Sequence, residues 1–317
     1  MNKKFLDLGY QPLANRYLKI FKKLSIKKGE LYKLGVGFNT KTKLVSLIKK
    51  IPDKKMFDKN YPYRSSMSKT MINSFKKLSI KIKRKFKPKL FLEIGSNDGA
   101  FIQNFSKDKV VCVEPCSNLA KITKRKGYYT YDNYWNLNLA EKIKKKFNYV
   151  DVIYSSNTLT HINDLNGVFK SISLILNKNG VLIIEDPSFL ECIKKGSYDQ
   201  FYNEHIYVFS ALAVKNIIKK YNLELFDIET LKTHGGSLRY YIKKKDNKNI
   251  KIKNSVINQL SKEIQFGLNN FRTYKKFSEN VKKSKKSLIK ILTKIKKDNH
   301  NIIGYGATAK ASTVLNY

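Results

Sequence analysis

The residues Phe91-Leu92-Glu93-Ile94-Gly95-Ser96-Asn97-Asp98-Gly99 form the most informative stretch of the chain, an apolar run that ends in an acid and two glycines. Gly95 and Gly99 allow the backbone to turn tightly and to come close to a ligand. We expect a strand over 90–94 and a helix after Gly99, whose free N–H groups would face a carboxylate or a phosphate. The pattern therefore predicts a nucleotide-type binding loop at the end of a strand.

A second apolar run also ends in an acidic residue, at the position expected for the next strand of the sheet. Val110-Val111-Cys112-Val113-Glu114 has the spacing expected of the next strand, where the Glu114 carboxylate would accept both hydroxyls of a ribose. The alternative is a surface glutamate at a strand end. The G-x-G-x-x-G spacing of dinucleotide enzymes is absent, and Glu-x-Gly-x-Asn-Asp-Gly is the pattern that S-adenosylmethionine (SAM) enzymes favour. Together the motifs predict a SAM site containing Glu93, Gly95, Asn97, Asp98, Gly99 and Glu114.

Short apolar runs alternate with helix-period stretches between 90 and about 245. The runs cover 90–94, 110–113, 150–154 and 181–185, and two further strand candidates cover 223–230 and 237–243. This alternation indicates βαβ units, and hence an α/β fold with a doubly wound, Rossmann-like central sheet. Ahead of it, an amphipathic helix is predicted from Ser65 to Lys85 by the helical spacing of Met67, Met71, Phe75, Leu78 and Ile82.

The chain divides into four expected parts: a small N-terminal module over 1–60, a helical connector over 61–89, the central SAM-binding domain over 90–245, and a C-terminal part over 246–317. In the last part, apolar residues at helical spacing predict one or two long helices over 255–299. The segment from Ile302 to Ala307 then predicts a strand and a glycine turn before a helix start. We interpret it as the start of a truncated C-terminal α/β domain, or as a segment that packs on another element.

The chain is strongly basic, with 64 Lys plus Arg against 24 Asp plus Glu and a formal charge of +40. Lysine is spread through every segment, which favours a composition bias over a nucleic-acid footprint, so no nucleic-acid partner is expected. Cys112, Cys116 and Cys192 are too few for a disulfide framework or a zinc site. No signal peptide and no run of about 18 apolar residues is present, which predicts a cytoplasmic protein without a membrane partner.

Two polar clusters add candidate site residues. Asn157 and His161 follow the strand at 150–154, so they should lie at the carboxyl edge of the sheet, where ligands bind in open α/β folds. Tyr202, Glu204 and His205 supply a phenol, a carboxylate and an imidazole within one turn, as proton abstraction beside a carbonyl requires. The alternatives are a structural histidine at 161 and a polar helix start in which Glu204 is a cap partner.

The chain resembles the sugar C-methyltransferases, SAM-dependent enzymes that methylate carbon 3 of nucleotide-linked 4-keto-deoxysugars. The segments that carry the resemblance are Leu6 to Asn15, Tyr61 to Ser66, Glu93 to Gly99, Glu114-Pro115, Asn157 with His161, Tyr202 to His205 with Phe209-Ser210, His234 to Arg239, and Gly304 to Ala307 with Lys310. Because they occur in order along nearly the whole chain, they are more specific together than any one of them.

The resemblance implies an N-terminal zinc-binding module, a central SAM domain and a C-terminal α/β domain that helps to hold the nucleotide-sugar. This chain departs from the family twice. Asn39 and Thr42 stand where the second pair of zinc-binding cysteines would align, so no metal is expected. The family also continues well beyond the Gly-Tyr-Gly-Ala segment.

The resemblance further implies that Tyr202, Glu204 and His205 surround the reacting sugar, with His205 or Tyr202 as the base and His161 nearby to stabilise charge. We favour His205, because an ordinary imidazole pKa of about 6.5 suits a base at neutral pH. Asn157 joins the cofactor residues, and Tyr63, His234, Gly235 and Arg239 are the substrate-binding candidates, although Gly235-Gly236 alone would also indicate a hairpin turn.

The expected function is therefore methyl transfer from SAM to the carbon alpha to the ketone of a nucleotide-linked keto-deoxysugar, by base-assisted enolate formation. Two alternatives stay open. The positive charge favours a SAM-dependent RNA methyltransferase, and the short C-terminal part favours a non-catalytic protein that still binds SAM or a nucleotide-sugar.

Overall fold

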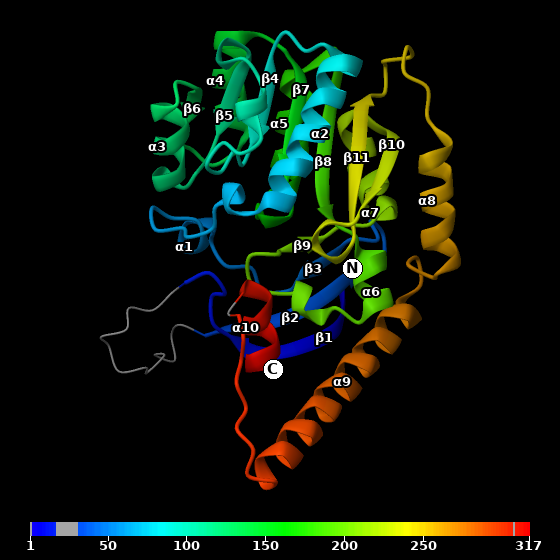
Figure 1. The fold of residues 1–317 in the computed structure, drawn as a ribbon. Coiled ribbons are helices and arrows are strands. Elements are labelled where there is room, and N and C mark those ends of the chain that lie inside the picture. Colours follow the sequence, from blue (N-terminus) through cyan, green and yellow to red (C-terminus); the bar gives the residue numbers. More distant parts are fainter. Residues whose placement is uncertain (1, 17–30, 307) are drawn as a thin grey trace.

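The computed structural model describes residues 2–16, 31–306 and 308–317, and in these residues the chain forms two sheets. The larger sheet has seven strands in the order β10-β11-β8-β7-β4-β5-β6 (Figure 1). They are β4 (Phe91–Ile94), β5 (Val110–Val113), β6 (Tyr129–Tyr131), β7 (Val150–Ser156), β8 (Leu176–Pro187), β10 (Leu223–Leu231) and β11 (Ser237–Lys244). Of these seven only β11 runs antiparallel to the rest. The predicted α/β class with a Rossmann-like centre is confirmed.

Helices cover both faces of this sheet, because alternate side chains of each strand point to opposite faces. On β4, Leu92 and Ile94 join one hydrophobic core and Phe91 joins another. The first core is completed by α4 (Leu137–Phe147), α5 (Leu165–Ile175) and α7 (Ala211–Ile218), and the second by α2 (Lys69–Phe86). Strands buried on both faces read as continuous apolar runs, which is why they were predictable. Between β5 and β6 lies α3 (Ser117–Arg125).

The predicted amphipathic helix corresponds to α2, with one correction. Ser68 caps its start by accepting the Met71 N–H, and the buried residues Met71, Phe75, Leu78 and Ile82 are those predicted. Met67 belongs instead to the preceding 3-10 turn (Ser65–Met67) and its side chain is 81% exposed, so its assignment to the apolar face was wrong.

The helix expected directly after Gly99 is a second correction. The chain continues through turns into a short 3-10 helix (Ile102–Asn104). Ala100, Phe101 and Ile102 are all buried in succession, and an α-helix with one apolar face cannot bury three consecutive residues in this way. The residues directly after Gly99 therefore do not form the N-terminus of an α-helix.

The N-terminal residues form a four-stranded antiparallel sheet in the order β1-β2-β3-β9. Its strands are β1 (Asn2–Gln11), β2 (Tyr32–Asn39), β3 (Val45–Leu47) and β9 (Tyr207–Val208). The last strand comes from the middle of the chain, and so do several apolar side chains of the core beneath this sheet, including Phe189 of α6 (Phe189–Lys195) and Phe277 of α9 (Phe271–Lys297). The N-terminal sheet is therefore built on later parts of the chain.

The C-terminal part confirms the predicted helices and corrects the predicted strand. The helices are α8 (Asn254–Gln265) and α9, followed by α10 (Ala309–Asn316). Residues 301–306 have no regular secondary structure and pair with no described strand, and Ile303 and Tyr305 are exposed. After this segment α10 returns to the body and contacts β1 (Figure 1). The Thr313 hydroxyl of α10 donates to the Phe201 carbonyl at 2.7 Å.

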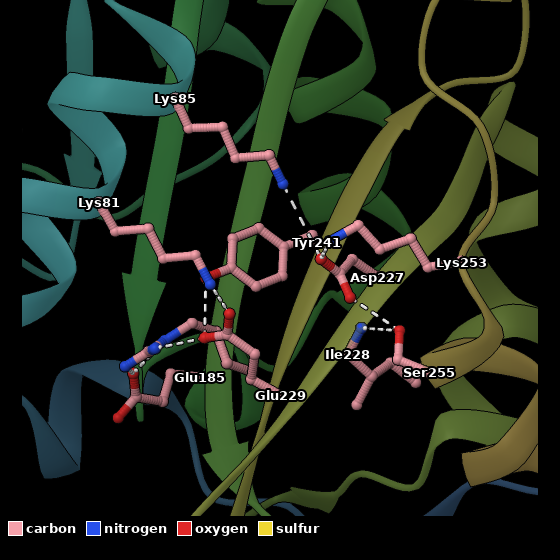
Figure 2. Close-up of polar contacts among 10 residues, drawn as sticks. Lys81, Lys85, Glu185, Asp227, Ile228, Glu229, Tyr241, Lys253 and Ser255 are labelled. Carbon is pink, nitrogen blue, oxygen red and sulfur yellow. Dashed lines mark hydrogen bonds and ion pairs between the residues drawn. The ribbon is translucent and has the colours of Figure 1, made fainter.

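Arg239, predicted to bind substrate, lies in an ion-pair network across β8, β10 and β11. Its guanidinium donates to the Glu185 carboxylate at 2.9 and 3.0 Å and to that of Glu229 at 2.8 Å. Lys81 of α2 also pairs with Glu229, and Lys253 pairs with Asp227 at 2.5 Å (Figure 2). Since Glu185 is fully buried, its charge requires this partner, which explains the position of Arg239 inside the protein rather than at a ligand site.

We predict that Arg239→Met lowers the free energy of unfolding by about 3 kcal/mol, because it leaves the buried Glu185 carboxylate without its cation. Urea titration measures this change. Lys81→Met is the matched control and should cost less than about 1 kcal/mol, since its ion pair is partly exposed. The double variant Arg239→Met, Glu185→Gln should recover part of the loss; equal stability of the Arg239 and Lys81 variants would contradict this account.

Candidate active site

A cavity of about 590 Å³ lies at the carboxyl ends of β4, β5 and β7. The order of strands reverses direction between β4 and β7, which is where open α/β sheets bind their ligands. Ten of the predicted site residues line the cavity: Tyr63, Glu93, Gly95, Asn97, Glu114, Asn157, His161, Tyr202, His205 and His234. Five do not: Asp98, Gly99, Glu204, Gly235 and Arg239.

The loop after β4 depends on Gly95 for two reasons. Its φ of +78° lies in the left-handed region, and a Cβ atom at this position would come within 2.2 to 2.8 Å of the Thr158 side chain. Gly95 therefore allows the loops that follow β4 and β7 to approach each other at the cavity. Gly99 also has a positive φ, of +83°, but it supports the turn from outside the cavity.

Two buried carboxyl groups, Glu93 and Glu114, line this end of the cavity, and burial raises the pKa of Glu114. Glu114 accepts the N–H groups of Asn97 and Cys116 at 2.8 and 2.9 Å, one on each oxygen. Burial raises the pKa of Glu93 well above its ordinary value, with Glu114 and Asp98 adding to the effect, and one Glu93 oxygen is buried without a hydrogen-bond partner. A cationic ligand with hydroxyl groups fits this environment. Its positive charge would stabilise the ionised form of the buried carboxyl groups, and its hydroxyl groups would donate hydrogen bonds to their oxygens, including the unpartnered one of Glu93.

Asn97 and Asp98 hold a covering segment, the strap (residues 53–66), over the cavity. The Asn97 side chain accepts the Ser65 N–H at 2.9 Å and donates to the Tyr63 carbonyl at 3.2 Å. Asp98 accepts hydrogen bonds from the N–H and hydroxyl of Ser66. Asp98 therefore supports the site by fixing the strap, and it does not line the cavity.

Tyr202 and His205 form a hydrogen-bonded pair whose direction follows from the neighbouring carbonyl. His205 Nδ1 lies 2.7 Å from the Gln200 carbonyl oxygen, which only accepts, so Nδ1 carries the proton. His205 Nε2 then accepts from the Tyr202 hydroxyl at 2.5 Å. Burial lowers the pKa of His205 well below its ordinary value, with His161 and Lys310 adding to the shift, so the imidazole is neutral and weakly basic. The ordinary pKa assumed from sequence does not apply here.

His161 stacks between two rings at the cavity wall. Its ring centroid lies 5.0 Å from that of His205 and 5.6 Å from that of Phe57 in the strap. Burial lowers the pKa of His161 to about 4, and its Nε2 atom is buried without a hydrogen-bond partner among the described residues. At neutral pH it is therefore an uncharged imidazole with one nitrogen free to bind a ligand atom.

Glu204 lies behind the cavity wall. Its carboxylate accepts from the Asn15 side chain at 2.8 and 2.9 Å and from the Tyr61 hydroxyl at 3.0 Å. Both partners line the cavity, whereas Glu204 does not. Burial raises the pKa of Glu204 to about 7. Its predicted place around the reacting sugar is thus corrected: it positions two cavity residues from the N-terminal part of the chain.

The His234 segment closes another side of the cavity. His234 has a left-handed φ of +52°, and its Nε2 lies 3.4 Å from the side-chain nitrogen of Asn157. Its carbonyl accepts from the Gln200 side chain at 3.1 Å. Gly235 has a φ of +85° and contributes its carbonyl to Lys195, so it shapes the turn rather than the cavity. Three of the four histidines of the chain, 161, 205 and 234, line the same cavity.

Several cavity residues were not predicted. Asn15, Phe57, Tyr61, Trp135 and Lys310 all line the cavity. The motifs containing Asn15, Tyr61 and Lys310 carried the family resemblance, which was the available signal for them. Trp135 and Phe57 belong to no such motif. Trp135 is 4% exposed, and its indole N–H is buried without a partner among the described residues.

Asn39, aligned with a family zinc ligand, instead stabilises the turn after β2. Its side chain accepts the N–H groups of Lys41 and Thr42 at 3.0 and 2.9 Å. In the described part of the chain, no group of three or more His, Cys, Asp or Glu residues is arranged to hold a metal ion. The same residues include no helix that is both long and apolar enough to cross a membrane.

Comparisons with known proteins agree with this architecture. The profile of a methyltransferase domain matches residues 63–228, and that of a C-methyltransferase C-terminal domain matches residues 232–317. The chain is 25% identical over 228 residues to C-methyltransferase NovU of Streptomyces niveus, covering 71% of this chain and 54% of NovU. It therefore spans about half the length of this curated relative.

Solved structures similar to part of the chain include an S-adenosylmethionine-dependent methyltransferase from Clostridium acetobutylicum, at 13% identity and a TM-score of 0.41, covering 54% of this chain and 91% of that one. The PH0226 protein from Pyrococcus horikoshii is 15% identical with a TM-score of 0.44, covering 57% of this chain and 94% of that one.

The mostly parallel sheet, the acidic glycine loop at its switch point and the matching profile identify a methyltransferase domain of the class I, SAM-dependent type. The chain belongs to the methyltransferase-domain family, whose profile covers more than half of it. The C-terminal profile and the NovU relative confirm the predicted likeness to C-methyltransferases.

We predict that Gly95→Ala abolishes binding of S-adenosylhomocysteine in calorimetric titration, because the added Cβ would overlap the Thr158 side chain and displace the loop. Gly196→Ala is the matched control, since Gly196 has a similar φ of +64° but no atom within 4 Å of the added carbon. That variant should retain binding. Wild-type affinity in Gly95→Ala would show that the loop does not form the cofactor site.

We also predict that Glu204 makes stability depend on pH. Its pKa is about 7 in the folded protein and 4.5 ordinarily, so the folded state binds the proton more tightly. The resulting stabilisation is present below pH 4.5 and is lost as the pH rises through 7, by about 3 kcal/mol at 1.4 kcal/mol per pKa unit. Denaturant titrations at several pH values should show a flatter profile for Glu204→Gln than for wild type. The exposed control Glu141→Gln should keep the wild-type slope; a wild-type slope in Glu204→Gln would refute the assignment.

Proposed function

We propose that this enzyme transfers the methyl group of SAM to the carbon alpha to the ketone of a nucleotide-linked keto-deoxysugar. The observation that carries the proposal is the Tyr202–His205 pair, which lines the same cavity as Glu93 and Glu114. One part of the cavity thus suits a cationic cofactor, and another offers acid–base groups. The C-methyltransferase profile and the NovU relative support transfer to carbon, and the sequence resemblance supports a sugar substrate.

The residues around Gly95 and Glu114 would hold the cofactor. The Glu114 carboxylate has lone pairs left for ribose hydroxyls after accepting two backbone N–H groups, and the unpartnered Glu93 oxygen can accept from a ligand ammonium. The buried carboxylates also favour positive charge in this region. Bound SAM supplies an electrophilic methyl group carried on a sulfonium.

The hydrogen-bond direction assigns roles to Tyr202 and His205. Because Nε2 of His205 is already occupied by the Tyr202 hydroxyl, the tyrosine oxygen is the atom that would receive the proton from the substrate carbon. The hydroxyl proton then moves to Nε2, and the C–H electron pair remains on the substrate as an enolate. The resulting imidazolium is stabilised by the Nδ1–H bond to the Gln200 carbonyl. His205 is thus the final proton acceptor and Tyr202 the group that relays the proton.

His161 would stabilise the enolate oxygen. Its pKa of about 4 keeps the ring uncharged at neutral pH, and its buried Nε2 is unpartnered in the described residues, so it can present an N–H donor to a ligand oxygen. A neutral imidazole can polarise a carbonyl without giving up its proton. Stacking against Phe57 and His205 fixes its orientation. In this proposal Tyr202 and His205 remove the proton, and His161 stabilises the charge of the enolate.

We predict that Tyr202→Phe slows exchange of the substrate alpha proton with deuterium oxide, and methyl transfer, by about 100- to 10,000-fold. The two rates are followed by mass spectrometry with nucleotide-linked 4-keto-deoxysugars, the second in the presence of SAM. Tyr198→Phe is the matched control, because Tyr198 is buried outside the cavity. Binding of S-adenosylhomocysteine should be unchanged in both variants. Binding without exchange or methylation by the wild type would exclude the proposed reaction.

A further inference from the structure

One lysine stands apart from the rest of this lysine-rich chain. Lys310 is the only lysine or arginine among the described residues that line the cavity, although the whole chain carries 64. It lies in the first turn of α10, the helix that returns to the body after the irregular segment 301–306. The Thr313 hydrogen bond to Phe201 and the packing of Tyr317 against Tyr198 hold this helix in place. Lys310 is therefore delivered to the cavity by a fixed element.

The Lys310 ammonium makes no ion pair or hydrogen bond with any residue that the structure describes. Burial lowers its pKa, and Asp199 opposes that shift from a distance. A half-buried cation without a direct partner is costly, and an anion bound beside it would remove the cost. This arrangement points to a negatively charged ligand group.

Lys310 also acts on the acid–base groups. Its charge contributes, after burial, to lowering the pKa values of His205 and His234. The cavity is thus divided by charge, with Glu93 and Glu114 near the glycine loop and Lys310 near the histidines. An anionic substrate group is repelled by the carboxylates and attracted to Lys310, which would orient the substrate with its neutral part between them.

We propose that Lys310 binds a phosphate group of the substrate and thereby sets the orientation of the sugar toward Tyr202 and His205. This inference rests on the proposed function, because a nucleotide-linked sugar carries its diphosphate next to the sugar ring. It also has a consequence for catalysis. A phosphate at Lys310 neutralises the cation that opposes protonation of His205, so substrate binding strengthens the acceptor of the proton.

The test uses the full chain with inorganic pyrophosphate as the probe, at physiological salt, to suppress binding by surface lysines. Binding is followed by NMR of the histidine ring signals, assigned by single histidine substitutions. Pyrophosphate should shift the signals of His205 and His234 in the wild type, while the exposed His300 serves as an internal reference. Lys310→Met should weaken the binding that produces these shifts by about 10- to 100-fold. Lys310→Arg should retain it.

The control variant is Lys290→Met, which removes the same charge from the exposed part of α9. Equal weakening in the Lys290 and Lys310 variants, or absence of His205 and His234 shifts in the wild type, would overturn the proposal. Calorimetry with S-adenosylhomocysteine on the same samples shows whether each variant is folded. Lys310-dependent pyrophosphate binding without methylation of any keto-sugar would sustain the anion site while rejecting the proposed reaction.

Discussion

The geometry of the site depends on the hydrogen bonds of Asn97. Its backbone N–H donates to Glu114 at the end of β5. Its side-chain amide accepts from the Ser65 N–H and donates to the Tyr63 carbonyl, both in the strap. A single residue thus joins the glycine loop, the neighbouring strand and the segment that covers the cavity. Its left-handed φ of +50°, which asparagine tolerates better than most residues, makes these three contacts compatible.

The central sheet was largely predictable because its strands are buried on both faces and are therefore apolar throughout. β6 was missed, since Tyr129-Thr130-Tyr131 is short and partly exposed. The N-terminal sheet was missed for another reason. It pairs β3 with Tyr207 and Val208, and pairing between residues so far apart leaves no local pattern. The strand expected near Ile302 does not form, because a strand needs a pairing partner as well as a suitable local sequence, and residues 301–306 pair with no described strand.

The residue types of the site were predictable, but their connections were not. Sequence motifs located the glycine loop, Glu114, His161, Tyr202 and His205. All of these predicted residues line the cavity except Asp98 and Gly99 of the glycine loop. What the sequence does not contain is the orientation of each polar group. Glu204 faces Asn15, 189 positions earlier in the chain, and the His205 tautomer depends on the Gln200 carbonyl. Such relations arise only when the segments are packed together.

The position of Trp135 has a practical consequence. It is the sole tryptophan of the chain, and it stands in the cavity wall with its indole N–H unpartnered in the described residues. All tryptophan fluorescence of this protein therefore originates from one ring at the ligand cavity. The protein carries an intrinsic optical reporter, so the arrival and departure of ligands can be followed in real time without attaching a dye.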